Sequence, residues 1–352
     1  MIKAKFIKLI GSTVMVTLIL AACSKPQKDQ SQSNTQVPEK KTISYYYTAN
    51  EGGSITKIDS ATNKVLDTIK DKGQPHNIQV SPDGKIVAYT SAVIEDEKKM
   101  NENDSMGMNG SALFYDIDTG KLIKKVELGK HPAHVVFTQD GKYVLVTNNE
   151  DNNVSVIDAK TYKLINNIMV GKGPHGFRIS KDSKFAYVAN MGEDTVSVVD
   201  IENNNELRKI KVGKTPITTA VTSDGKTLTV TSNAENTLAI IDLTTDKIEK
   251  IAVGVGPAQV YIGPDDKYAF VANQGTEKNP SSTVSKIELA TKKVIATIQA
   301  GKGAHGVVTS PDNKFLYVTN MYENTVSVID NNTNKVIATV PVDKTPNGIS
   351  YR

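Results

Sequence analysis

Residues 174–212 read PHGFRISKDSKFAYVANMGEDTVSVVDIENNNELRKIKV, and this stretch decides the fold. Apolar and polar residues alternate along it in runs of five or six residues, which is the period of a β-strand. Short polar turns separate the runs. The pattern therefore predicts four short strands, at residues 175–180, 185–190, 195–200 and 207–212.

This unit recurs along the chain, and a loop proline or its substitute marks each copy. The marking residues are Pro75, Pro132, Pro174, Pro216, Pro257, Ala304 and Pro346. Their spacings of 57, 42, 42, 41, 47 and 42 residues give a unit of 42 residues with extra material in two copies. Recurrent Asp-Gly and Asp-Asn pairs supply the positive φ that tight hairpins need. Periods of this size indicate stacked or circular repeats rather than separate domains.

The two ends of the repeat region complement each other. Residues 45–47 match the second strand of a unit, whereas residues 347–351 match a first strand. Completing one sheet from both ends closes a ring and leaves few exposed sheet edges. We therefore predict an all-β fold over residues 42–352: a seven-bladed β-propeller with four strands per blade, closed by N- and C-terminal strands in one blade.

Two motifs carry a resemblance to a known family. The segment Tyr317-Val-Thr-Asn320 is followed by NTVSVID at residues 324–330, and near matches to the first motif stand at residues 187–190 and 270–273. The sequence resembles the YVTN repeat family of β-propellers over the whole repeat region. That family includes surface-layer proteins, DNA-associated periplasmic proteins and relatives of haem d1 propellers, so the resemblance implies the fold and no single activity.

The N-terminus has the features of a targeting segment. Residues 1–22 contain three lysines and no acid, then an apolar stretch and small residues just before Cys23, as in a secretory signal peptide. This end resembles the bacterial lipobox, which implies a lipoprotein whose Cys23 is acylated, for example with palmitate, and anchored to a bacterial membrane outside the cytoplasm. An ordinary signal peptide with an incidental cysteine is the alternative. Residues 23–41 are polar and are expected to form a flexible tether.

Composition excludes several functions. Cys23 is the one cysteine of the chain, so a disulfide framework, a cysteine-based zinc site and an iron–sulfur cluster are excluded. The formal net charge is +4, but the repeat region holds 35 basic against 36 acidic residues. Nucleic acid is therefore not expected as a partner.

All five histidines fall in the loop that precedes the first strand of a unit. His76, His175 and His305 directly follow the marking position, whereas His131 and His134 flank it in the third blade. In a propeller this loop lies on the same face as the loop between the second and third strands. We therefore take His76, His134, His175 and His305 as candidate ligand-binding residues at one mouth of the central channel.

Methionines gather on the same expected face. Met191 and Met321 share one repeat position in blades four and seven, and Met100, Met106 and Met108 lie in an insertion of blade two. Imidazole together with thioether suits Cu(I), and either group can be an axial ligand of haem. Repeats also copy loop residues, so inherited turn chemistry explains the recurrent histidines without any ligand.

Three functional hypotheses follow. The first is a non-enzymatic, monomeric binding scaffold that holds an unidentified protein or small molecule at the channel mouth and reaches the membrane through its N-terminal lipid. The second is a copper- or haem-binding, redox-linked propeller with His76, His175, His305, Met191 and Met321 as ligands. The third is a lactonase-like hydrolase, for which the sequence offers no recognisable acid, base and metal set, so no catalytic residue is predicted.

Overall fold

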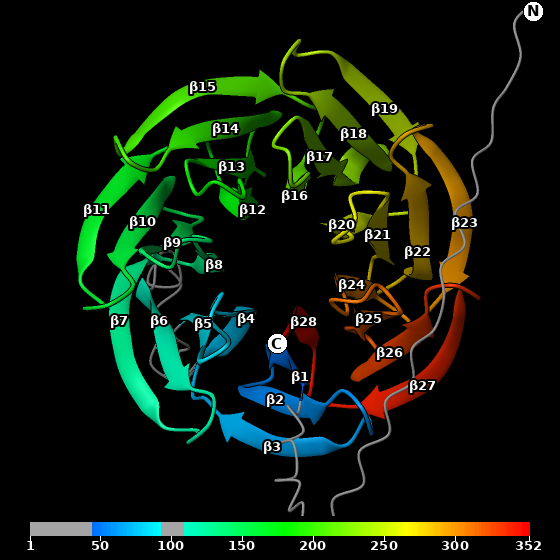
Figure 1. Cartoon of the computed structure of the whole chain (residues 1–352), viewed down its shortest axis with the longest axis horizontal. Coiled ribbons are helices and arrows are strands. Elements are labelled where there is room, and N and C mark those ends of the chain that lie inside the picture. The colour runs from blue at the N-terminus through cyan, green and yellow to red at the C-terminus, as the bar shows by residue number, and fades with distance from the viewer. Residues whose placement is uncertain (1–43, 93–108) are drawn as a thin grey trace, which may run out of the picture. The chain divides into compact units, whose positions relative to one another are not determined.

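The computed structural model describes residues 44–92 and 109–352, which form a ring of seven four-stranded antiparallel sheets (Figure 1). Each sheet is one blade, and its strands succeed one another outward from the centre of the ring. The predicted seven-bladed β-propeller is therefore confirmed. The residues Cys23, Met100, Met106 and Met108 lie outside the described part of the chain.

Two strands of each blade lie nearest the centre of the ring. The innermost strands are β4 (Gln74–Val80), β8 (Pro132–Phe137), β12 (Pro174–Ile179), β16 (Pro216–Val221), β20 (Pro257–Ile262), β24 (Ala304–Thr309) and β28 (Pro346–Tyr351). The second strands are β1 (Tyr45–Asn50), β5 (Ile86–Ala92), β9 (Tyr143–Asn148), β13 (Phe185–Asn190), β17 (Thr227–Ser232), β21 (Tyr268–Gly275) and β25 (Phe315–Asn320). Neighbouring innermost strands contact one another, so together they line the central channel.

The other two strands of each blade form the outside of the ring. The third strands are β2 (Ser54–Asp59), β6 (Asn109–Asp116), β10 (Asn153–Asp158), β14 (Thr195–Asp200), β18 (Thr237–Asp242), β22 (Pro280–Glu288) and β26 (Thr325–Asp330). The outermost strands are β3 (Val65–Lys70), β7 (Leu122–Lys130), β11 (Leu164–Met169), β15 (Asn205–Lys211), β19 (Ile248–Ala252), β23 (Lys293–Gln299) and β27 (Lys335–Pro341). Most positions of β3 and β11 are exposed, so the core lies inward of them.

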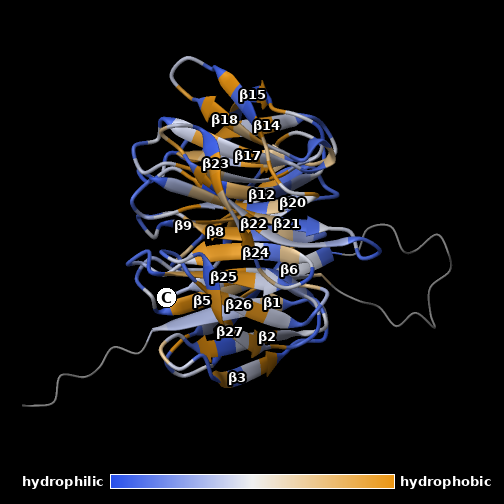
Figure 2. Cartoon of the chain, turned by 90° about the vertical axis from the view of Figure 1, so that its right-hand side faces the viewer, coloured by the Kyte–Doolittle hydropathy of each residue, from blue (hydrophilic) through white to orange (hydrophobic). Residues whose placement is uncertain are grey.

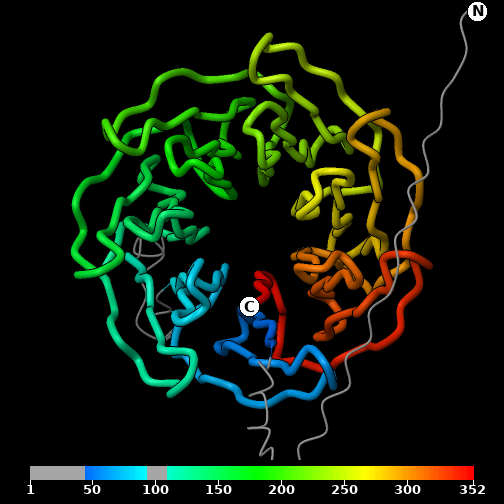
Figure 3. Tube along the Cα trace, viewed as in Figure 1, coloured from blue at the N-terminus to red at the C-terminus, as the bar shows by residue number. Residues whose placement is uncertain are grey.

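The two ends of the described chain close the ring within one blade. Strand β28 pairs with β1, with Tyr46 opposite Tyr351 and Thr48 opposite Ile349, to give the order β28-β1-β2-β3. Figure 3 shows the C-terminal strand beside the N-terminal one on the inner side of the ring. This confirms the prediction that the first copy of the repeat lacks the strand that the last copy supplies.

Tight hairpins join the first and second strands of the blades, as the Asp-Gly and Asp-Asn pairs predict. The backbone takes φ values of 70° at Gly84 and 59° at Asn313. The Asp83 carboxylate accepts hydrogen bonds from Ser81 Oγ at 2.6 Å and Lys85 N at 3.1 Å. These aspartates therefore stabilise turns, and the turns lie at the ends of the inner strands away from the loops that carry histidine.

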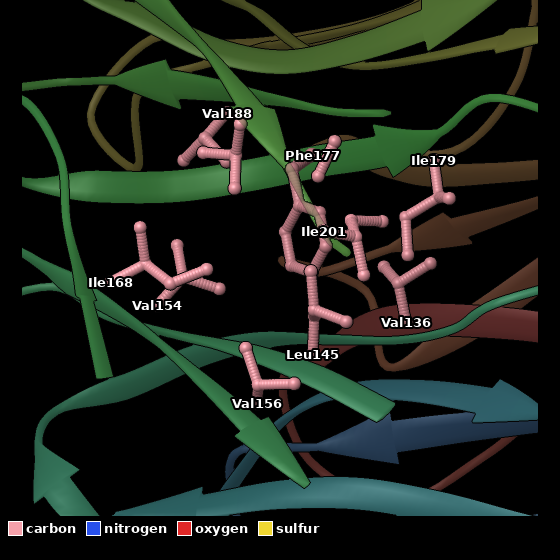
Figure 4. Close-up of a cluster of buried hydrophobic side chains, with 11 residues drawn as sticks. Val136, Leu145, Val154, Val156, Ile168, Phe177, Ile179, Val188 and Ile201 are labelled. Carbon is pink, nitrogen blue, oxygen red and sulfur yellow. The ribbon is translucent and has the colours of Figure 1, made fainter. Parts of the chain in front are cut away.

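The hydrophobic core lies between neighbouring blades. One cluster joins blades three and four and contains Val136, Leu145, Val154, Val156, Ile168, Phe177, Ile179, Ala186, Val188, Val199 and Ile201 (Figure 4). Figure 2 shows apolar strands in the interior and mostly hydrophilic loops on the two faces. Because each blade packs against the next, the separation of their inner strands is fixed.

Two details differ from a pure four-strand repeat. Strand β15 begins two residues earlier than predicted, because a bulge between Val198 and Val199 lets the pairing continue to Asn205. A single 3₁₀ turn, η2 (Asn233–Glu235), interrupts the described strands. In the described ranges there is no helix with the length and apolar character needed to cross a lipid bilayer.

Candidate metal centre at the channel mouth

Three histidines meet where the innermost strands of blades two, three and four begin. His76 lies on β4, His134 on β8 and His175 on β12. One ring nitrogen from each residue lies within 4.8 Å of the others. The ring centroids of His76 and His175 are 5.2 Å apart, and those of His134 and His175 are 5.1 Å apart. We call these three residues the histidine cluster.

Fixed acceptors orient two of the three rings. His76 Nδ1 lies 2.9 Å from Glu51 Oε1, and His175 Nδ1 lies 3.2 Å from the carbonyl oxygen of Ile217. Both acceptors lack a proton to donate, so each Nδ1 carries the hydrogen and each neutral ring keeps a lone pair on Nε2. These two Nε2 atoms face each other at 3.2 Å. When both rings are neutral, two lone pairs converge at this distance, and either a proton on His76 Nε2 or a cation between the rings removes their repulsion.

His134 contributes a buried imidazole without a hydrogen-bond partner. The residue is 0% exposed, and neither its Nδ1 nor its Nε2 has a partner within the described structure. A buried polar group left unpaired costs about 1–3 kcal/mol. A ligand bound between the three rings would satisfy it.

Burial favours the neutral form of His134 and His175. Desolvation, with a smaller contribution from the neighbouring His76, lowers the pKa of His175 to about 3. Desolvation also lowers the pKa of His134 well below its usual value, and the charge of His175 acts in the same direction. Neutral imidazole is the form that binds metal ions, so His134 and His175 need no deprotonation near neutral pH.

Glu51 and Asn347 complete the site, although neither was predicted as a site residue. Asn347 Nδ2 donates to Glu51 Oε1 at 2.7 Å. Burial alone would raise the pKa of the Glu51 carboxyl, but the hydrogen bonds and charge of His76, together with Asn347, outweigh it and lower the pKa to about 2. Glu51 follows Asn50 as Met191 follows Asn190, so its repeat position was the signal that could have identified it.

Buried threonines of the second strands hold the cluster in place. Thr147 Oγ1 accepts a hydrogen bond from His134 N at 3.0 Å and donates one to the carbonyl of His175 at 2.7 Å. Thr90 Oγ1 similarly joins Asn77 N and the carbonyl of Ala133, at 3.1 and 2.7 Å. Each threonine therefore ties the inner strands of two neighbouring blades at the level of the histidines.

The remaining candidate ligands lie outside the histidine cluster. His305, on β24, is 6% exposed and has its Nδ1 3.4 Å from the carbonyl oxygen of Asn347. Burial, with a contribution from His76, lowers the pKa of His305 to about 4. Met321 Sδ lies 3.2 Å from the side-chain amide nitrogen of Gln274, and Met191 is 39% exposed.

The geometry of the cluster matches adjacent ligands of one metal ion. In a tetrahedral site with metal–nitrogen bonds of about 2.0–2.1 Å, neighbouring nitrogens lie about 3.4 Å apart, close to the 3.2 Å between His76 and His175. Two axial nitrogens on opposite sides of an iron would lie about 4 Å apart. The Glu51–His76 contact is the carboxylate–histidine pairing that orients metal-binding imidazoles.

Two family models match the chain. The model described as the choice-of-anchor I domain matches residues 34–252, and the model described as the cytochrome D1 heme domain matches residues 228–349. The first range includes all three residues of the histidine cluster, and the second includes His305. No curated protein sequence matches the chain.

Solved structures with the same fold come from several kinds of protein. Hydrazine synthase of Kuenenia stuttgartiensis is 24% identical, with a TM-score of 0.66 over 78% of this chain and 89% of that one. A putative 6-phosphogluconolactonase of Bacteroides fragilis is 16% identical, with a TM-score of 0.69 over 90% and 99%. Dihydro-heme d1 dehydrogenase NirN is 15% identical, with a TM-score of 0.62 over 87% and 74%. These likenesses establish the propeller fold.

Proposed function

The chain belongs to the choice-of-anchor I domain family, and we propose that it is a lipid-anchored, extracytoplasmic β-propeller that binds a transition-metal ion at its channel mouth. The proposal rests on the two Nε2 atoms of His76 and His175, which face each other at 3.2 Å while an acceptor holds each Nδ1. A cation between them removes the repulsion of the lone pairs. His134 is the third ligand.

Copper is the metal that the surrounding residues favour. Imidazole suits copper, zinc, iron and nickel, whereas thioether selects Cu(I). Met191 lies in the blade that supplies His175, at the repeat position that Glu51 occupies in the first blade. The cluster is the metal-binding site of the scaffold, and Met191 and Met321, which lie outside the cluster itself, are thioether donors at the same repeat position as Glu51.

A metal titration tests this function. The protein from residue 24 to 352 is titrated with Cu(I), Cu(II) and Zn(II) against chelators of known affinity. We expect one ion per chain, with at least one of these metals bound more tightly than about 1 µM. His134→Ala and His175→Ala should each weaken binding by at least tenfold.

His131→Ala is the matched control. The ring centroid of His131 lies 6.3 Å from that of His76, but its imidazole is half exposed and its Nδ1 lies 3.6 Å from Glu150 Oε1, so it is a neighbour of the cluster that is not one of the three proposed ligands. We expect its removal to change metal affinity by less than twofold. Failure of every metal to bind more tightly than about 1 µM, or equal losses in His131→Ala and His175→Ala, would contradict the proposal.

Haem is a second candidate ligand. The match to the cytochrome D1 heme domain, and the likeness to a structure titled as a dihydro-heme d1 dehydrogenase, support it. The separation of the two Nε2 atoms is too short for axial ligands on both sides of one iron, so a haem would use a single histidine. Titration with haem under the same conditions, followed by the Soret band, separates the two candidates. Lactone hydrolysis is supported only by the similarity in fold to the structure titled as a putative 6-phosphogluconolactonase.

The membrane anchor is a separate part of the proposal. Cys23 and the lysine-rich, apolar residues before it support lipidation, and acyl chains contribute about 0.8 kcal/mol per buried CH₂ to membrane binding. We expect Cys23→Ala to release the protein from the membrane fraction of a bacterial host. Retention of Cys23→Ala in membranes after a high-salt wash would contradict lipid anchoring.

A further inference from the structure

A cavity of about 300 Å³ lies toward the other end of the central channel. It is lined by the later residues of innermost strands, among them Gln79 on β4, Arg178 on β12 and Ser350 on β28. Pro264 and Pro311, which belong to turns between first and second strands, border it. The cavity therefore faces the side of the ring opposite the histidine cluster.

Arg178 brings an unpaired positive charge into this cavity. Its Nη1 donates to the neighbouring carbonyl of Phe177 at 2.9 Å, and no carboxylate pairs with the guanidinium in the described structure. Among the described residues, no acidic side chain lines the cavity. Burial lowers the pKa of Arg178, with Tyr261 acting in the opposite direction, but an arginine in a protein stays charged. A buried charge without a counter-ion is destabilising.

Two polar side chains that line the cavity with Arg178 have hydrogens free to donate. Gln79 Oε1 already accepts a hydrogen bond from Phe137 N at 2.6 Å, which leaves the amide nitrogen as the free end of that side chain. Ser350 Oγ accepts from Val80 N at 3.0 Å, which leaves its hydroxyl hydrogen. Amide and hydroxyl hydrogens beside a guanidinium match an oxygen anion, which accepts several hydrogen bonds and carries the opposite charge.

This group of donors is separate from the histidine cluster. His175 and Arg178 lie three residues apart on β12, as His76 and Gln79 do on β4. Three residues of strand extend about 10 Å, so the two sets of side chains leave the strands at different levels of the channel. The first residues of β4 and β12 therefore contribute to the histidine cluster, and their later residues line the cavity.

We propose that this cavity binds a small molecule bearing a carboxylate or phosphate group, with Arg178 as its counter-ion and Gln79 and Ser350 as hydrogen-bond donors. The ligand is small because 300 Å³ is at the lower end of the size range of small-molecule pockets. The site is independent of the metal centre, so it stands or falls separately from the proposed function.

Anion titration at constant ionic strength tests this site. Sodium phosphate and sodium malonate are titrated against the metal-free protein in calorimetry, with sodium chloride as the reference salt. We expect at least one of the two anions to bind with a dissociation constant of a few millimolar or less, at least tenfold more tightly than chloride. Binding of phosphate alone or malonate alone identifies which group the cavity takes.

Three variants identify the residues responsible. Arg178→Gln should weaken anion binding by at least fivefold, whereas Arg208→Gln, which removes the same charge from an exposed pair with Asp246, should change it by less than twofold. Gln79→Glu keeps the acceptor for Phe137 N but places a negative charge beside Arg178. It should abolish anion binding even if Arg178→Gln does not fold.

Thermal unfolding of the same variants is a second test. Without anion, Arg178→Gln and Gln79→Glu should melt at or above the temperature of the native protein, since each removes or pairs the isolated charge. Native protein that binds neither anion more tightly than chloride, or a loss of less than fivefold in both Arg178→Gln and Gln79→Glu, overturns the proposal.

Discussion

At the scale of single residues, the ionised Glu51 carboxylate determines which nitrogen of His76 faces the other rings. It accepts from Nδ1 at 2.9 Å, so the lone pair of the neutral ring lies on Nε2. The carbonyl of Ile217 has the same effect on His175. Burial lowers the pKa of His175, so this ring combines a fixed tautomer with low proton affinity.

The low pKa values of the buried histidines predict that the fold loses stability in mild acid. In the unfolded chain a histidine binds a proton near its usual pKa of 6.5, whereas His175 in the fold does so only near 3. The free energy of unfolding therefore falls as the pH drops from about 7, by about 2 kcal/mol at pH 5 for such a histidine. Glu51, whose pKa is about 2 in the fold, adds a further loss below pH 4.5.

Urea unfolding at pH 7 and pH 5 measures this dependence. His175→Asn can keep a donor toward the Ile217 carbonyl but has no imidazole to protonate. The difference between the free energies of unfolding at pH 7 and pH 5 should therefore shrink by about 2 kcal/mol. His131→Ala, at an exposed position, should leave it unchanged. A native protein equally stable at both pH values would show that the buried rings are already protonated or solvated.

Thr147 is a positioning residue for the histidine cluster, since it joins His134 N to the carbonyl of His175. We expect Thr147→Val to weaken metal binding by about tenfold, as loss of outer-shell support does in other metal sites, and Thr147→Ser to restore most of it.

Thr229→Val provides the control for Thr147→Val. Thr229 is a buried threonine of β17 whose Oγ1 donates to the carbonyl of Ala220 at 3.2 Å, away from the peptide groups that hold the histidines. Both valine variants should lose about 1–3 kcal/mol of stability. Only Thr147→Val should lose metal affinity, and equal affinities in the two variants would assign Thr147 a purely structural role.

At the scale of strands, the repeat made the face of the histidines predictable, whereas a bulge at the start of each inner strand hid which of them meet. The repeat places the histidines on one face because a residue's place in the blade fixes its face. Pairing on β8 runs from Pro132–Asn148 to Val135–Val146 with one extra residue on β8. Strict alternation therefore fails here, and simple strand periodicity could not show that His134 reaches His175 from a different repeat position.

Gly176 lets two inner strands approach beside the cluster. A Cβ at this position would lie 2.2 Å from Thr218 Cγ2 and 2.7 Å from the carbonyl oxygen of Ile217, the acceptor of His175 Nδ1. Gly176→Ala should therefore push β16 away from β12, reduce stability by about 1–3 kcal/mol and weaken metal binding.

Gly192→Ala is the control for Gly176→Ala in the same blade. The nearest atoms to its Cβ would lie at 3.2–3.3 Å, so a shift of a few tenths of an ångström accommodates it. Differential scanning calorimetry and the metal titration compare the two variants. Equal stability of Gly176→Ala and the native protein would show that β16 is not held at this distance.

At the scale of the whole molecule, the ring depends on the pairing of β28 with β1. Removal of residues 346–352 takes away the inner strand of the first blade, exposes the edge of β1 and removes Asn347 from Glu51. We expect this truncated protein to melt at a much lower temperature and to associate, since an exposed strand edge pairs with other chains.

A shorter truncation distinguishes loss of the strand from loss of the chain end. Removal of Arg352 alone takes away an exposed pair with Asp118 and one backbone bond to Tyr45. We expect the protein without Arg352 to melt at nearly the same temperature as the native protein and to elute as a monomer in size-exclusion chromatography. If the 346–352 deletion also elutes as a stable monomer, six complete blades close the ring by themselves.

Main-chain carbonyls that accept hydrogen bonds from histidine Nδ1 atoms affect which substitutions the channel mouth can tolerate. His175 Nδ1 lies by the carbonyl of Ile217, and His305 Nδ1 by that of Asn347, and each acceptor holds the histidine's own repeat position in the following blade. A main-chain carbonyl is present whatever side chain stands there. At these two junctions between blades the backbone alone orients an imidazole, whereas His76 depends on the Glu51 side chain. New combinations of donor groups can therefore arise at such junctions by single substitutions, without altering the architecture that supports them.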